Sequence, residues 1–287
     1  MYFVLIILFF SAPVSWGKAL SCEGLYSSTE QKRIKHPEVY FYADKDWKII
    51  PEKEKNIKIL FEDLAQLTQS KISLPQELKV TLRKAGDGAA YDHGVIYAPD
   101  EFIATKYHKH PLTTQTVLSH EWGHALLEQN LAERFPAIKK QMQLEEQQAV
   151  EFRKIFYSYN ELFADVVPVI YKKDGHITRD PLFSYAHSNK ENEDALMRDF
   201  TRKHKLKGWS LEGSYAMLAP TRSFLWQEYL SKPHVQKKSG LALEALIEAI
   251  GEEVNYRLHY PAIQFTPEAV NRRLMDAVAK QMQKRNL

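Results

Sequence analysis

Residues 120–124 read His120-Glu121-Trp122-Gly123-His124, an H-E-x-x-H pattern. On an α-helix, residues four apart are rotated by only about 40° from each other and lie one turn apart on the same face. The two imidazoles can therefore converge on one small ion, and zinc is an ion that imidazole nitrogen binds well. The carboxylate of Glu121 directly follows the first histidine, where it can reach a water on the ion without binding the ion itself.

The residues on either side of this motif are apolar, with Val117 and Leu118 before it and Ala-Leu-Leu at 125–127 after it. A buried metal helix needs such flanks, because a nearby charge would compete for the ion or add a desolvation cost. The alternative interpretation is a surface helix that carries two histidines at this spacing by accident.

The third ligand decides the subclass of site. In the metzincin pattern a glycine follows the second histidine by three residues, and another histidine follows three residues later. This chain has Leu127 and Asn130 at those positions, which excludes the pattern. Further along the chain, one N-E-x-x-x-D pattern lies in an apolar stretch compatible with a helix, and it reads Asn160-Glu161-Leu162-Phe163-Ala164-Asp165.

With both motifs in this order, the chain resembles the gluzincins, the thermolysin-like clan of zinc metallopeptidases. The resemblance covers roughly residues 95–170. It implies one Zn²⁺ ion held by His120, His124 and Glu161, and it implies Glu121 as the general base. It also implies a zincin-like α+β fold, in which a small N-terminal sheet and the metal helix form one lobe and a mainly helical C-terminal lobe closes the cleft.

The same resemblance assigns two residues to the support of the ligands. Asp165, on the helix face of Glu161, is similar in position to the carboxylate that holds the first histidine, here His120. Asn160 is similarly placed to hold His124. Groups of this kind fix the imidazole tautomer and raise the basicity of the ligand.

Amide hydrolysis also builds an oxyanion, which a tyrosine, histidine or arginine donor can stabilise by about 2–4 kcal/mol. Thermolysin-like enzymes take such donors from the C-terminal lobe, where five residues are candidates: Tyr185, His187, His204, Tyr215 and Arg222. Tyr215 and Arg222 are seven residues apart in a helix-like stretch, so we expect them on nearly the same face. A structural ion pair is the alternative role of Arg222, because a buried guanidinium needs a partner.

Composition limits the other classes of function. The chain has 287 residues, 44% of them hydrophobic and 12% aromatic, which excludes bulk disorder. Its formal net charge of +3 is too small to indicate binding to nucleic acid or to an anionic membrane. The expected partner is a protein or peptide substrate.

The first residues predict export. Residues 2–10 form an unbroken apolar run that is too short for a transmembrane helix and fits a secretory signal peptide, which we place at residues 1–21. No Lys or Arg precedes the run, which departs from the usual signal. Cys22, the only cysteine, follows Ser21 as in a bacterial lipoprotein cleavage box, although Leu20 is atypical there. The two alternatives are a lipid-anchored outer-membrane protein and a soluble periplasmic or secreted protein with a free thiol.

Periodicity predicts the elements of the rest of the chain. A loop-rich lead-in is expected at 22–50, then an N-terminal lobe at about 51–132 and a helical C-terminal lobe at about 133–287. Strands are expected at 77–83 and 94–98, the second as the cleft-edge strand that pairs with substrate, or alternatively as a core strand. Helices are expected at 52–71, 114–132, 136–158, 159–172 (ended or kinked at Pro168), 191–205, 212–231, 241–256 and 267–284.

Together these patterns predict an exported zinc metallopeptidase in which Glu121 deprotonates a zinc-activated water. Two alternatives remain open on the sequence alone. One is a zinc hydrolase of a non-protein substrate, since the motif specifies the activated water and not the bond that is cut. The other is a secreted binding or effector protein with a structural zinc, although a structural site closes its fourth position with a residue and needs no base.

Overall fold

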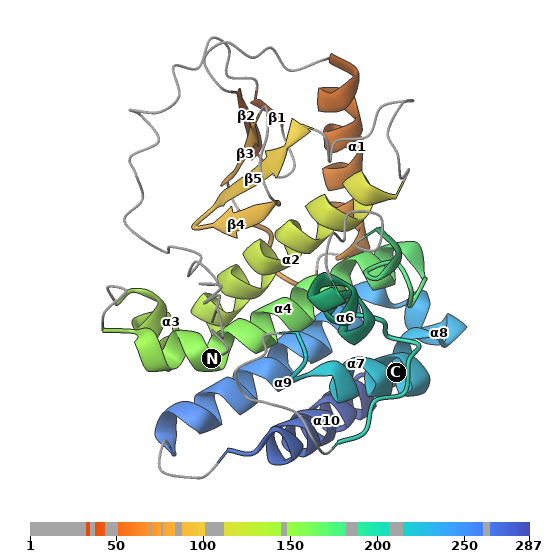
Figure 1. Cartoon of the computed structure of the whole chain (residues 1–287). Helices are drawn as coiled ribbons and strands as arrows, with labels where there is room; N and C mark the ends of the chain where they lie inside the picture. Colours follow the sequence, from red (N-terminus) through yellow and green to blue (C-terminus); the bar gives the residue numbers. More distant parts are fainter. Residues whose placement is uncertain are drawn as a thin grey trace, which may run out of the picture.

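The chain has an α+β fold, mostly helical, with a mixed sheet near its N-terminus (Figure 1). The computed structural model describes residues 33–34, 38–43, 51–68, 71–75, 77–83, 88–100, 112–144, 148–181, 189–206, 215–260 and 265–287. The predicted signal peptide, Cys22, Tyr185 and His187 lie outside the described residues.

The sheet has five strands in the order β1-β2-β3-β5-β4. Their bounds are Arg33–Ile34 (β1), Glu38–Ala43 (β2), Glu77–Arg83 (β3), Ala90–Asp92 (β4) and Val95–Pro99 (β5). β2, β3 and β5 run parallel, while β1 and β4 are antiparallel to their neighbours. The predicted strand at 77–83 is confirmed, and its alternating apolar residues Leu78, Val80 and Leu82 are fully buried.

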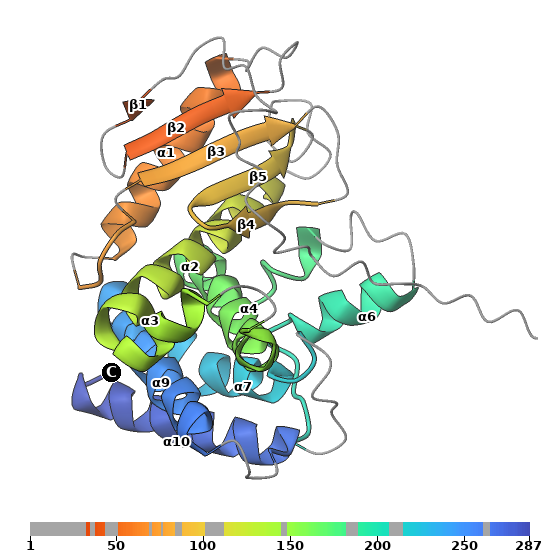
Figure 2. The ribbon, with the colours of Figure 1, turned by 90° about the vertical axis from the view of Figure 1, so that its left-hand side faces the viewer.

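The strand predicted at 94–98 is confirmed as β5, but its predicted role as the edge strand is wrong, and the alternative of a core strand holds. β5 is an inner strand, because it pairs with β3 on one side and with β4 on the other. A tight turn adds β4 outside it: His93 and Gly94 have φ of 42° and 87°, as a two-residue hairpin loop of the type I′ class requires. β4 is therefore the edge strand, and like β5 it lies against the metal helix (Figure 2).

Helix α2, Thr113–Arg134, carries the H-E-x-x-H motif and lies between the two parts of the fold (Figure 1). It contacts α1 (Pro51–Leu67), β4 and β5 on one side, and α4 (Val150–Lys172) and α9 (Ser239–His259) on the other. Trp122 is fully buried and stacks on Phe61 of α1 with ring centroids 5.1 Å apart. The helix predicted at 114–132 is thus confirmed as a buried element.

The remaining helices are α3 (Pro136–Met142), α6 (Asn189–Met197), α7 (Ala219–Leu225), a π-helical turn at Trp226–Leu230, α8 (Pro233–Gln236) and α10 (Pro267–Lys284). Three predicted helices are shorter than expected. The one at 136–158 is divided between α3 and α4, the one at 191–205 ends at Met197, and the one at 212–231 begins only at Ala219. Among the described residues, no helix combines the length and apolarity that a membrane span requires.

Helix α4 passes through Pro168 and ends at Lys172, the end predicted for the helix at 159–172, so of the two effects expected of the proline an end of the helix is excluded. Its neighbours Val167 and Val169 are fully buried, and this packing holds the helix together across the position that lacks an N–H. The carbonyl left without that N–H belongs to Ala164, and it faces Gly123 of α2: a Cβ built on Gly123 would lie 3.2 Å from the Ala164 oxygen and 2.6 Å from its Cα.

This contact leads to a prediction for Gly123→Ala. We expect the free energy of unfolding to fall by about 1–3 kcal/mol through overpacking, although alanine favours a helix over glycine by about 1 kcal/mol. The new methyl group meets backbone atoms of α4, so the helices must separate, and any metal ion held between α2 and α4 is expected to bind more weakly. Urea unfolding and a metal titration measure both effects.

The matched control is Gly251→Ala in α9. The three atoms nearest to its methyl group would all be ring atoms of Phe135, a half-buried side chain that can turn away. We expect a smaller loss of stability than for Gly123→Ala. Equal losses in the two variants, with zinc affinity unchanged, would show that the approach of α2 to α4 does not limit the site.

Candidate metal centre

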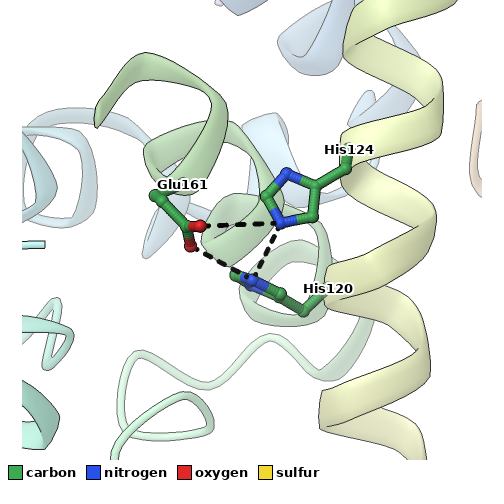
Figure 3. A group of neighbouring side chains, drawn as sticks. All are labelled: His120, His124 and Glu161. Carbon is green, nitrogen blue, oxygen red and sulfur yellow. Dashed lines mark hydrogen bonds and ion pairs between the residues drawn. The ribbon is translucent and has the colours of Figure 1, made fainter. Parts of the chain in front are cut away.

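His120, His124 and Glu161 meet in the interior, where the first two come from α2 and the third from α4 (Figure 3). His120 Nε2 lies 3.2 Å from His124 Nε2 and 3.3 Å from Glu161 Oε2, and His124 Nε2 lies 3.9 Å from Glu161 Oε1. All three side chains are buried. Two ligands of a tetrahedral zinc ion, each about 2.0–2.1 Å from it, are about 3.3 Å apart, so these separations fit one ion.

The donor set also fits zinc in its chemistry. Two imidazole nitrogens and one carboxylate are the protein ligands of an open, three-ligand zinc site. Glu161 Oε2 is buried, and its one close polar neighbour is His120 Nε2 at 3.3 Å, so a cation between the two atoms would satisfy both. Among the described residues, this is the one group of histidine, cysteine and carboxylate side chains with the geometry to hold a metal ion.

The pKa values of the three side chains shift in different directions. Burial lowers the pKa of His120, and Arg198 lowers it further, but hydrogen bonds to Asp165 and Glu161 outweigh both and raise it to about 9. Burial raises the pKa of Glu161, but its hydrogen bond with His120 and the charge of His124 bring it down to about 2. Burial alone dominates at His124 and lowers its pKa to about 4.

Asp165 is fully buried beneath this group. Its Oδ1 lies 3.0 Å from His120 Nδ1, on the opposite side of the ring from the nitrogen that faces Glu161. Two arginines also hold it: Arg198 donates to Oδ1 from Nε (3.0 Å) and from NH2 (2.6 Å), and Arg222 donates to Oδ2 from Nε (3.0 Å). Burial raises the pKa of Asp165, but these two cations and His120 hold it well below its usual range.

Sequence reasoning did not identify Arg198. This arginine follows α6 and is buried, with its NH2 also 3.1 Å from His120 Nδ1 and its guanidinium 4.6 Å from the ring centroid of Tyr215. A single arginine 33 residues after Asp165 belongs to no spacing pattern, so the sequence held no indication of this role.

Arg222 forms a structural ion pair, the role that the sequence offered as the alternative to an oxyanion donor. It is fully buried. Its guanidinium donates from Nε to Asp165 and from Nη1 to the backbone oxygen of Tyr215, the latter at 2.7 Å. Tyr215 lies in a turn before α7, so the predicted common helix face for the two residues is wrong.

The other oxyanion candidates have separate environments. Burial and the charge of Glu161 raise the pKa of Tyr215 well above 10, which places its phenol within electrostatic reach of the centre. Burial and the charges of Arg202 and Arg222 lower the pKa of His204.

Asn160 and Glu121 complete the surroundings of the ligands. Asn160 is buried beside His124 and raises its pKa, and the buried atoms His124 Nδ1 and Asn160 Oδ1 make no hydrogen bond within 3.5 Å. Burial raises the pKa of Glu121 to about 7, although His120 lowers it, and the backbone N–H of Tyr91 also lowers it by hydrogen bonding. Glu121 Oε2 is buried and has no hydrogen-bond partner.

The described residues thus form a buried His-His-Glu group that is compatible with one metal ion, with a further carboxylate beside it. Sequence reasoning also missed Tyr91, although His93-Gly94 between two short runs is typical of a hairpin loop and could have predicted β4. No protein-family model and no curated protein sequence matches the chain.

Proposed function

We propose that this protein is a zinc-dependent metallopeptidase of the gluzincin type with a zincin-like fold. The observation that carries the proposal is the convergence of three buried ligands from two helices, His120 and His124 from α2 and Glu161 from α4, within 4.8 Å of one another. Glu121, next to the first ligand, is buried and has an unpartnered carboxylate oxygen. A site that binds metal for structure alone has no need of such a group.

His120, His124 and Glu161 would hold the zinc, and Asp165 would orient the His120 ring through Nδ1. Zinc bound there supplies Lewis acidity, which makes a water more acidic and polarises a carbonyl. Asn160 is close enough to act on His124 and would take the corresponding position on the other ring.

Glu121 is placed to move the proton. Its Oε2 has no hydrogen-bond partner and can accept a proton from the attacking water. The same oxygen then returns the proton to the leaving amide nitrogen. Burial raises the pKa of the Glu121 carboxyl group, which favours uptake of that proton.

Tyr215 is the residue that we propose as the oxyanion donor. Its phenol interacts electrostatically with Glu161, and the guanidinium of Arg198 lies over its ring at 4.6 Å. Arg222 is unsuited to this role because its guanidinium is already bound to Asp165 and to the backbone.

A peptide is the substrate that the neighbouring sheet favours. The edge strand β4 lies against α2, and an edge strand can pair with an extended chain through main-chain hydrogen bonds. The apolar segment at residues 2–10 supports the further proposal that the protein is exported, as a lipoprotein anchored at Cys22 or in soluble form. The intact mass of the mature protein distinguishes these two forms.

The test is zinc content and peptide cleavage of the wild type beside Glu161→Ala. Loss of a direct ligand is expected to weaken zinc binding by more than about 100-fold, since even the supporting partners of ligands contribute 10–100-fold, and cleavage of casein or a peptide library is expected to stop. Glu133→Ala, at an exposed glutamate of α2, is the control, and this variant should keep both zinc binding and peptide cleavage. A Glu161→Ala protein that binds zinc normally would overturn the ligand assignment, and a zinc-loaded wild type inert toward all amides would overturn the peptidase.

A further inference from the structure

A second buried group of charged side chains lies where α9 packs against α4 and α10 (Figure 1). We call it the arginine cluster, and it consists of Tyr159, Glu253, Arg257, Phe265 and Arg273. Tyr159 comes from α4, Glu253 and Arg257 lie one turn apart on α9, and Arg273 comes from α10. None of these residues belongs to the metal centre.

The carboxylate of the arginine cluster is already paired. Glu253 is 4% exposed, and Arg273 donates to its Oε2 from Nε at 3.0 Å and to its Oε1 from Nη2 at 2.7 Å. The hydroxyl of Tyr159 also donates to Oε1, at 3.2 Å. Two guanidinium groups therefore share one carboxylate, which leaves one positive charge uncompensated.

That charge is on Arg257, which is 6% exposed. Within the described part of the chain, its one hydrogen bond runs from Nη1 to the Tyr159 oxygen at 3.2 Å, and this acceptor is neutral. Its Nε is buried and has no hydrogen-bond partner. No ion pair between described residues includes Arg257, whereas Arg273 holds Glu253. Arg257 is thus a buried cation whose Nε edge is unpaired.

Aromatic rings compensate this cation only in part. The Phe265 ring centroid lies 4.4 Å from Arg257 Cζ, but Arg273 uses the same ring at 5.3 Å, and the Tyr159 centroid is 5.8 Å from Arg257 Cζ. Such contacts recover less than the desolvation cost of a buried guanidinium, and a hydrogen-bonded anion recovers more of it. The anions that a guanidinium binds best are oxyanions, because two parallel N–H groups match two oxygens.

We propose that Arg257 anchors an oxyanion site, in which a small carboxylate or phosphate group binds the unpaired Nε edge of the guanidinium. The outer side of the arginine cluster reaches solvent, since the side chain of Arg273 is 29% exposed and Tyr256, whose ring it covers at 5.1 Å, is 36% exposed. The site uses neither a metal ligand nor Glu121, so it stands or falls independently of the proposed function.

The first test is Arg257→Met, which removes the cation and keeps an unbranched side chain. In chloride buffer without oxyanions, we expect the variant to be at least as stable toward urea as the wild type, because an apolar group replaces a buried charge that has no ion pair. A variant that is much less stable, or that does not fold, would show that Arg257 is a structural cation held by the rings and would overturn the proposal.

The second test adds sodium phosphate or sodium acetate at constant ionic strength. The ratio of folded to unfolded wild type should rise in a saturable way, by about a hundredfold at a hundred times the Kd, and Arg257→Met should lack this rise. Calorimetric titration of the folded protein measures the Kd directly. The anion with the lower Kd, phosphate or acetate, identifies the class of ligand.

Arg272→Met is the matched control, because Arg272 lies beside Arg273 on α10 but is 62% exposed and pairs with Glu268. It should keep the wild-type response. Phosphate also stabilises folded proteins in general and binds zinc, but both effects persist in Arg257→Met and cancel in the comparison. Equal responses of Arg257→Met and Arg272→Met would overturn the site.

The third test changes the charge balance of the arginine cluster. Glu253→Gln removes its negative charge and frees the charge of Arg273, so we expect oxyanion affinity to rise about tenfold. Glu252→Gln, at the neighbouring and 38% exposed glutamate, is the control and should leave the affinity unchanged. Weaker oxyanion binding in Glu253→Gln than in Glu252→Gln would contradict the proposal.

Discussion

Glu121→Gln is expected to lower kcat for peptide hydrolysis by at least about 10³-fold, while the protein keeps its zinc and its stability. The amide has the shape of the carboxyl group, but it cannot take up a proton. A general base contributes about 10²–10⁴-fold to the rate, and Glu121 Oε2 is a buried carboxylate oxygen beside the ligands with no hydrogen-bond partner. Rates and zinc content, measured on the same preparation, separate loss of the base from loss of the metal.

Glu133→Gln, the same change at an exposed position of α2, is the control for this variant. It should match the wild type in kcat and in zinc content. A Glu121→Gln protein that turns over at more than a tenth of the wild-type rate would exclude Glu121 as the base. Loss of zinc from this variant would instead make Glu121 a ligand.

Asp165→Asn is expected to lower the free energy of unfolding by about 3–5 kcal/mol, the cost of leaving buried charges without their partner. Asp165 is the shared acceptor of two buried arginines, Arg198 and Arg222, and of His120. An asparagine presents an oxygen on one side and an NH2 group on the other, so one arginine must face a donor in either orientation. Urea unfolding with a zinc chelator present measures this cost separately from the loss of metal.

The control is Asp199→Asn, at another buried aspartate with cationic neighbours. Asp199 pairs with Arg179 and His176, whose side chains are 26% and 42% exposed, so water can solvate them when the charge is removed. We expect a loss of about 1 kcal/mol or less, as for exposed ion pairs. Equal losses in the two variants would show that the buried cluster of Asp165, Arg198 and Arg222 has no special role in stability.

The local elements of the fold could be predicted from the sequence. The helix expected at 267–284 is α10, with the same first and last residues. Thr266 caps its N-terminus by accepting a hydrogen bond from the Ala269 N–H, and Pro267 is its first residue. Its apolar residues recur at helical spacing, and Val270, Leu274 and Val278 are fully buried. The His-His-Glu group was predictable for the same reason, since each of its two motifs is local to one helix.

What the sequence did not predict depends on contacts between distant segments. Strand order places β4 outside β5, and no periodicity within 94–98 carries that information. Arg198 reaches Asp165 only because the chain folds back after α6. Pro168 usually ends a helix, but here the packing of α4 against α2 outweighs the local preference.

The close approach at Gly123 also has a consequence for the lifetime of the protein. The ligands come from two helices, so the complete set of three exists only after α2 and α4 have docked. An ion that binds only the docked state stabilises it by about 4 kcal/mol at a thousand times its Kd. When metal is scarce, more of the chain is unfolded and open to proteolysis, so the abundance of the protein would follow the zinc supply.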